Sequence, residues 1–114
     1  MELKFSHYGE ERPVNATDGE NAIFETLVSI IKANGQDPAP VRLTRKSDNY
    51  VTTALGVWDI ARFKWTDRAK WIQFPYAQDY KTKHKIKSTD DLWDYEDEII
   101  RHYSKALEYM LSNE

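Results

Sequence analysis

Hydrophobic residues change their spacing twice along this chain of 114 residues, and this change predicts which secondary structure each part can form. From Val41 to Phe74 apolar and polar residues alternate over long stretches, a period of two that predicts strands with one buried face. On both sides of this region apolar residues recur every three or four positions, as in amphipathic helices. Strands placed between two helices predict an α+β domain.

The first helix is predicted over residues 18–34. Thr17 followed three residues later by Glu20 is a capping-box pattern, and Gly35 is a natural C-terminal cap. A short strand with alternating residues over 3–7 precedes this helix. The apolar stripe that we expect to face the core consists of Ile23, Phe24, Leu27, Val28, Ile30 and Ile31.

Two hairpins are predicted in the middle of the chain. The first joins residues 41–46 to residues 50–55 through a polar turn, and the second joins residues 57–65 to residues 69–74. A three-residue turn in the second hairpin would pair Trp65 with Ala69 and place Phe63 and Trp71 on the same face as Trp65. In this predicted register the other face mixes cations with aromatic and aliphatic residues, namely Trp58, Ile60, Arg62, Lys64, Lys70, Ile72 and Phe74. A register slip of one residue would exchange the two faces.

The C-terminal part is predicted to be one long helix. It follows a polar loop over residues 76–87 that contains a short strand near residues 85–87, and Ser88 or Thr89 caps its start. We therefore expect a single domain over residues 1–114. Its fold class is α+β, with two layers, an antiparallel β-meander of about 4–6 strands, and two helices packed on one face. The expected buried stripe of the last helix consists of Leu92, Glu96, Ile99, Ile100, Tyr103, Leu107, Met110 and Leu111.

Charge is segregated along the chain in a way that the formal net charge of −3 conceals. Residues 41–88 carry eleven Lys or Arg against four Asp or Glu, a net charge of +7. Residues 1–40 carry three against seven, which gives −4, and residues 89–114 carry two against eight, which gives −6. Because aromatic residues are interleaved with the cations of the basic segment, this segment could bind an anionic, flat or strand-like partner.

Two groups of residues in the basic segment are candidates for such binding. In the second hairpin, cations would contact phosphates while a Trp stacks on a base. In the polar loop, four Lys at alternate positions would lie on one side of an extended chain and follow a phosphate backbone. The candidate binding residues are Trp58, Arg62, Lys64, Lys70, Trp71, Lys81, Lys83, Lys85 and Lys87.

Each group also has a purely structural interpretation. The cations of the hairpin could extend over a solvated sheet face whose other side is core. The alternating Lys could protect a sheet edge from pairing with another chain. The acidic residues at the start of the last helix, Asp90 and Asp91 among them, suit the positive end of a helix dipole and do not have the spacing of a calcium loop.

This sequence lacks the residues that several classes of function require. There is no Cys, the three His are far apart, and the four Gly stand singly, so we expect no catalytic residues, no metal site and no cofactor. No segment has the length and hydrophobicity of a signal peptide or a membrane span, so we expect a cytoplasmic protein. Asp67 and the triplet Asp79-Tyr80-Lys81 match the spacing of a restriction-nuclease-like metal site. That triplet, however, lies in a polar loop after Pro75, whereas such a site needs a buried strand.

One stretch carries a general resemblance. Residues 56–65, residues 68–72 and the capped helix from Thr89 resemble small bacterial α+β domains of unknown function, some of which accompany nuclease or restriction modules. The resemblance covers the C-terminal two thirds of the chain and implies no catalytic residues. It favours an association with nucleic acid.

Three functions are weighed on these observations. The first is a non-enzymatic binding module that uses a basic, aromatic sheet face, with nucleic acid or an acidic protein surface as its partner and no membrane. The second is a protein-interaction or homodimerisation module in which the same aromatics form an interface. The third is a divalent-metal-dependent nuclease-like enzyme.

Overall fold

The computed structural model describes residues 5–7, 17–45 and 50–112, and the fold is given for those residues. Leu3 of the predicted first strand and the predicted turn at residues 47–49 lie outside them. The elements follow in the order β1 (Phe5–His7), α1 (Asp18–Ala33), β2 (Val41–Arg45), β3 (Val51–Leu55), β4 (Trp58–Trp65), β5 (Lys70–Gln73), β6 (His84–Lys85), the 3₁₀ helix η2 (Thr89–Tyr95) and α2 (Glu96–Ser112).

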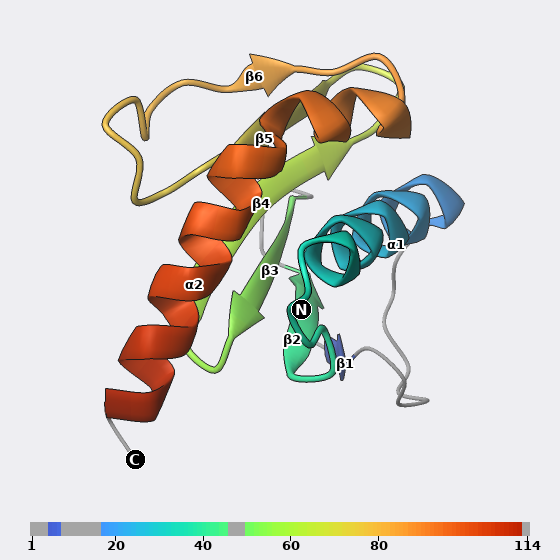
Figure 1. Ribbon diagram of the computed structural model, residues 1–114. Coiled ribbons are helices and arrows are strands. Elements are labelled where there is room, and N and C mark those ends of the chain that lie inside the picture. The colour runs from blue at the N-terminus through green and yellow to red at the C-terminus, as the bar shows by residue number, and fades with distance from the viewer. Residues whose placement is uncertain (1–4, 8–16, 46–49, 113–114) are drawn as a thin grey trace.

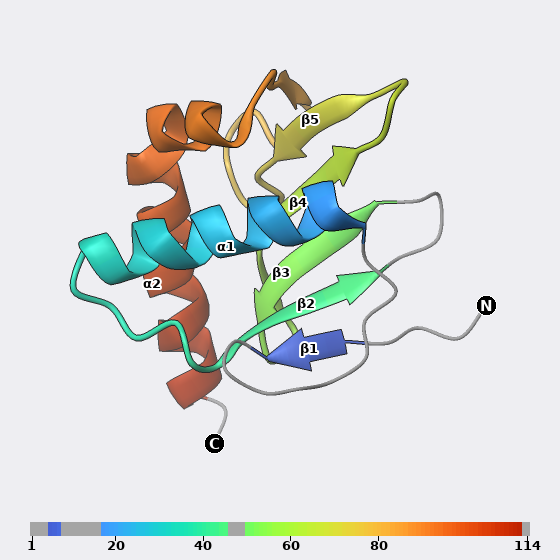
Figure 2. The same ribbon diagram turned by 90° about the vertical axis from the view of Figure 1, so that its right-hand side faces the viewer.

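The strands of the described residues form one antiparallel sheet in the order β1-β2-β3-β4-β5-β6. Each strand therefore pairs with its neighbour in sequence, which defines a meander. Figures 1 and 2 show α1 and α2 on the same side of the twisted sheet, with α2 crossing β3 and β4. The predicted two-layer α+β fold, with two helices on one face, is confirmed.

Helix α1 begins where the capping box predicts. The Glu20 N–H donates to Thr17 Oγ1 at 3.1 Å, and Glu20 Oε1 accepts from the Thr17 N–H at 2.8 Å, so two donors of the first turn are satisfied. At the other end Gly35 follows the helix with a φ of 76°, a conformation that glycine adopts without strain. The predicted stripe is buried as expected.

The core lies between the helices and the inner face of the sheet. Ile23, Leu27, Ile30 and Ile31 of α1 pack in one cluster with residues from the sheet and from α2. The strand residues of this cluster alternate with residues of the other face, except at a bulge where the register of β3 with β4 shifts between Thr53 and Ala54. A bulge inserts an extra residue on one strand and bends it. The strand residues in the core are Val41, Leu43, Val51, Leu55, Ile60, Ala61, Phe63 and Ile72.

The register predicted for the second hairpin is wrong by one residue. Trp65 pairs with Lys70 rather than with Ala69, because the turn contains four residues, Thr66 to Ala69. Thr66 stabilises this longer turn: its N–H donates to the Ala69 carbonyl at 2.8 Å, and its Oγ1 accepts from the Ala69 N–H at 3.0 Å. Trp71 therefore lies opposite Lys64, on the face away from the helices, and Ile72 lies in the core opposite Phe63.

The predicted single C-terminal helix is also corrected. The chain first forms η2, which packs against α1 and contains the buried residue Leu92. From Glu96 onward it forms α2, which lies over the sheet. The Asp91 carboxylate accepts from the Lys87 and Ser88 N–H groups at 2.7 and 3.2 Å at the start of η2. Leu111 of the predicted stripe is 57% exposed, and the residues of α2 that are buried are Ile99, His102, Tyr103 and Ala106.

Candidate functional site

The face of the sheet that carries no helix, called here the open face, presents a row of three cross-strand neighbours. Lys64 on β4 pairs with Trp71 on β5, and Trp71 pairs with Lys85 on β6. Directly opposed residues of neighbouring strands project to the same side of a sheet. A half-buried indole therefore lies between two lysines on the open face.

Two further side chains approach Trp71. The ring of Tyr50, just before β3, lies with its centroid 6.5 Å from that of Trp71 and its plane tilted by 34°. The ammonium of Lys83 lies 4.9 Å from the centroid of the Trp71 ring, a cation–π contact. The aromatic pair is thus surrounded by three lysines, contributed by β4, by β6 and by the residues just before β6.

A second row lies one step along the strands. Thr52 on β3 pairs with Arg62 on β4, and Arg62 pairs with Gln73 on β5. Arg62 Nε is 3.4 Å from a carboxylate oxygen of Asp59, so this guanidinium is held in place while 39% of its side chain stays exposed. Thr52 is buried, so the second row adds Arg62 and the half-buried Gln73 to the aromatic rings and cations of the first, a combination that suits a planar, anionic ligand.

The structure brings together five of the nine predicted binding residues. Trp58 and Lys70 lie on the helix-covered side instead: Trp58 packs against the core, and the Lys70 ammonium lies 4.7 Å over the Trp65 ring. The one-residue change of register explains the placement of Lys70, and the bulge between Thr53 and Ala54 explains that of Trp58, which pairs with Leu55. Those that lie on or over the open face are Arg62, Lys64, Trp71, Lys83 and Lys85.

The four alternating lysines do not form one extended row. The described strand in this region, β6, has two residues, and Lys81 precedes it in a turn with its ammonium 5.7 Å from the Tyr80 ring. Lys87 lies just before η2, where its N–H donates to Asp91. Of the four, Lys83 and Lys85 therefore belong to the surface around Trp71.

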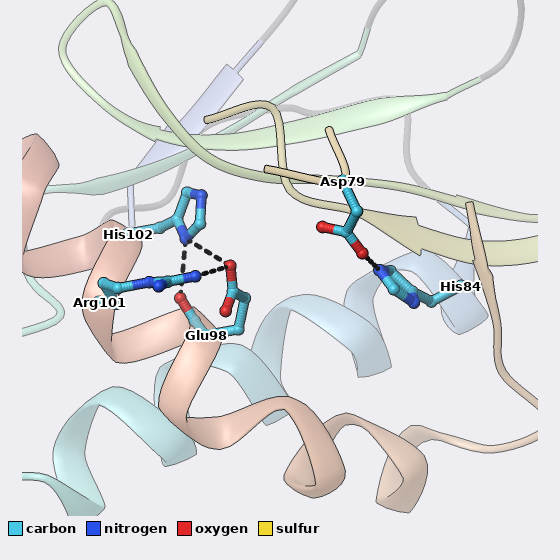
Figure 3. Close-up of polar contacts among 5 residues, drawn as sticks. All are labelled: Asp79, His84, Glu98, Arg101 and His102. Atoms are coloured by element: carbon cyan, nitrogen blue, oxygen red, sulfur yellow. Dashed lines mark hydrogen bonds and ion pairs between the residues drawn. The ribbon is translucent and has the colours of Figure 1, made fainter. Parts of the chain in front are cut away.

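A second polar cluster, which the sequence patterns do not predict, lies between α2 and the turns after β5 (Figure 3). His84 Nε2 is 3.1 Å from an Asp79 carboxylate oxygen. His102 Nδ1 is 2.9 Å from the Glu98 carbonyl oxygen, and Arg101 pairs with the Glu98 carboxylate. The signal in the sequence was a polar residue, His102, spaced three residues after Ile99 on the buried face of the last helix.

The residues of the nuclease-like spacing do not meet. Asp67 lies in the turn before β5 and Asp79 in the turns after it, so the whole strand separates them. Within residues 5–7, 17–45 and 50–112, no group of three or more His, Asp or Glu is arranged to hold a metal ion.

No helix of the described residues is long and apolar enough to span a bilayer. Comparisons of this chain with protein-family models, with curated proteins and with solved structures find no match. The resemblance to small bacterial domains remains a prediction.

Proposed function

We propose that this protein is a non-enzymatic module that binds single-stranded nucleic acid on its open face. The observation that carries the proposal is the row of Lys64, Trp71 and Lys85, with Lys83 over the indole. Aromatic side chains that stack on bases, beside cations that contact the backbone, are how proteins bind single strands without reading sequence. The proposal places the protein in the cytoplasm, where such strands occur.

The proposal favours a single strand over a duplex. The bases of a duplex are stacked on one another, and only unpaired bases can stack on a side chain such as Trp71. A short row of lysines on a sheet supplies phosphate contacts, which give affinity that falls as salt rises. Lys83 lies over the indole in the free protein, so a base would displace its ammonium toward the backbone phosphates.

The test is a titration of the protein with labelled single-stranded and duplex DNA and RNA at low and at physiological salt, followed by fluorescence anisotropy. We expect saturable binding to single strands that weakens with salt. Trp71→Ala should weaken binding at least fivefold, because stacking on an aromatic side chain contributes about 1–3 kcal/mol per base.

The matched control is Trp93→Ala. Trp93 is 40% exposed, but it lies on η2, away from the open face. Its removal should leave the affinity unchanged. Equal losses from both variants, or no binding at low salt, would contradict the proposal.

Self-association is the second candidate, since the open face is basic and the start of α2 is acidic. Glu96, Asp97 and Glu98 occupy the first turn of α2, so the basic face of one copy could meet the acidic helix of another. Sedimentation equilibrium at low salt tests this candidate. A dimer that dissociates in the variant Lys64→Glu would support it, and a monomer at all concentrations would refute it.

A further inference from the structure

A groove of about 860 Å³ lies along α2, on the helix side of the sheet and separate from the open face. Its walls include Tyr76 and Asp79 from the turns after β5, and Arg101, His102, Lys105 and Tyr109 from α2. Its volume falls in the range of sites that hold small organic molecules.

His102 presents an unsatisfied hydrogen-bond acceptor at this groove. Its side chain is buried, with 4% of the residue exposed. Nδ1 lies 2.9 Å from the Glu98 carbonyl oxygen and 3.6 Å from a Glu98 carboxylate oxygen, and both oxygens can only accept, so Nδ1 carries a proton. In an imidazole with a single proton, Nε2 is then a lone-pair acceptor, and no described residue donates to it. Figure 3 shows this nitrogen on the side of the ring away from Glu98.

Aromatic rings continue from His102 along the groove. The Tyr76 ring lies nearly parallel to the imidazole, with an interplanar angle of 17° and centroids 6.4 Å apart. Tyr109 also lines the groove, and Trp58, which does not line it, supports both tyrosines, with its ring centroid 6.4 Å from that of Tyr76 and 4.3 Å from that of Tyr109. A wall of this kind favours a planar ligand.

The charges of the groove argue against a phosphate as the main recognised group. Asp79, Glu98 and Glu108 line it together with Arg101 and Lys105, so carboxylates outnumber cations by one. Arg101 is moreover paired with Glu98. The ligand that matches these features is uncharged or weakly cationic, planar, and has hydrogen-bond donors and acceptors on its edge.

We infer that this groove binds a small planar nitrogen heterocycle of the nucleobase type, with a ligand N–H donating to His102 Nε2. Nε2 is buried in the free protein, so binding requires Tyr76 to move from its place on the imidazole. Tyr76 is 48% exposed in a turn, which leaves it room to do so. The inference rests on the groove alone and does not depend on nucleic-acid binding at the open face.

The direct test compares two ligands that differ in one donor. The wild-type protein is titrated with 9-methyladenine, whose amino group donates, and with N6,N6-dimethyl-9-methyladenine, which has no N–H. We expect the first to bind roughly tenfold more tightly, the effect of one hydrogen bond to a neutral group. The ¹⁵N chemical shift of His102 Nε2 should move on saturation with 9-methyladenine, as expected for a nitrogen that accepts a hydrogen bond.

Variants separate this site from its surroundings. His102→Phe should abolish the preference between the two ligands, and Tyr76→Ala should change the affinity for 9-methyladenine. Tyr80→Ala should not change it, because Tyr80 is equally exposed at 50% in the same turn region but does not line the groove. Trp71→Ala should leave it unchanged too, so failure of this inference and failure of the proposed function are distinguishable. Absence of saturable binding to the wild type, or equal affinity for both ligands, overturns the inference.

Discussion

Gly19 in the first turn of α1 permits a close approach that a larger residue would block. A Cβ at this position would fall inside van der Waals contact of Cδ1 and Nε1 of Trp65, at the end of β4. Alanine is intrinsically better than glycine in a helix by about 1 kcal/mol, whereas overpacking a close contact costs about 1–3 kcal/mol. The cost of the clash should exceed the gain in helix propensity, because the contact is with a bulky ring.

We therefore predict that Gly19→Ala lowers the free energy of unfolding by about 1–2 kcal/mol, measured by urea denaturation. In a Trp65→Leu background the sign should reverse, since the ring is gone and only the helix propensity of alanine remains. A stabilising effect of Gly19→Ala in the wild-type background would refute the close packing.

Tyr103 makes the fold sensitive to alkaline pH. Its buried hydroxyl donates to the Asp37 carbonyl oxygen at 2.6 Å. Burial, and secondarily the Asp37 carboxylate, raise the pKa of Tyr103 above its ordinary value. Because the folded state holds the neutral phenol, its contribution to stability is complete below the ordinary pKa of about 10. It is lost as the pH rises from there through the raised pKa of the folded state.

We expect the free energy of unfolding to fall more steeply above pH about 10 in the wild type than in Tyr103→Phe. At neutral pH the variant should be less stable by about 1 kcal/mol, because it lacks the hydrogen bond. Tyr80→Phe, at an exposed position, is the control and should follow the wild-type curve at every pH. Parallel curves for wild type and Tyr103→Phe would contradict the assignment.

At the scale of elements, the turn between β4 and β5 decides which residues reach the open face. The strands, the capping box of α1 and the order of elements could be predicted, because alternation and capping patterns are local. The register could not, because Thr66-Asp67-Arg68 reads as a complete three-residue turn. The Thr66 side chain accepts a hydrogen bond from the Ala69 N–H, so Ala69 becomes the fourth residue of the turn. The pattern of apolar residues does not encode this hydrogen bond. The three-residue turn therefore predicts the wrong face for Trp71, and the bulge between Thr53 and Ala54 places Trp58 against the core rather than on the open face.

Neighbouring residues of β5 provide the test of this register. Ile72→Ala should lower the free energy of unfolding by about 2–5 kcal/mol, the cost of truncating a core residue. Trp71→Ala should cost about 1 kcal/mol or less, because its ring lies on the open face. Thermal or urea unfolding measures the loss of stability in each variant. A larger loss for Trp71→Ala than for Ile72→Ala would contradict the four-residue turn and support the three-residue turn.

The last helix illustrates a second limit of sequence patterns. One stripe from Leu92 to Leu111 satisfies the spacing of a single helix, yet η2 packs against α1, whereas α2 packs on β3 and β4 as well as on α1. A change of direction between two helical segments leaves the spacing of apolar residues nearly intact. His102 is missed for a related reason, since a polar residue on a buried face does not strengthen an apolar stripe.

At the scale of the whole molecule, the segregated charges of the sequence become two layers. Among the described residues, most Lys and Arg lie on the strands and the turns between them, and most Asp and Glu lie on the helices; the molecule measures 24 Å along its shortest axis. With a Debye length of about 8 Å at physiological salt, the acidic layer is largely screened from a ligand on the open face. Binding there should depend on a few local cations rather than on net charge.

A titration across salt concentrations tests that expectation for single-stranded DNA. Four phosphates contacted by Arg62, Lys64, Lys83 and Lys85 would give a slope of log K against log salt of about −3. Lys85→Ala should reduce the slope by about 0.7, and Lys105→Ala on α2 should leave it unchanged. Equal effects of the two variants would mean that net charge, rather than the open face, determines the affinity.

The meander also determines the order in which the protein can assemble during synthesis. Each strand pairs with the one made just before or after it, so hairpins can close as the chain leaves the ribosome. Helix α2, which covers β3 and β4, is made after every strand of the sheet. Until it emerges, the part of the inner sheet face that α2 covers on β3 and β4 stays exposed. The interval between the synthesis of β6 and that of α2 is therefore when a nascent chain of this protein most needs shielding from its neighbours.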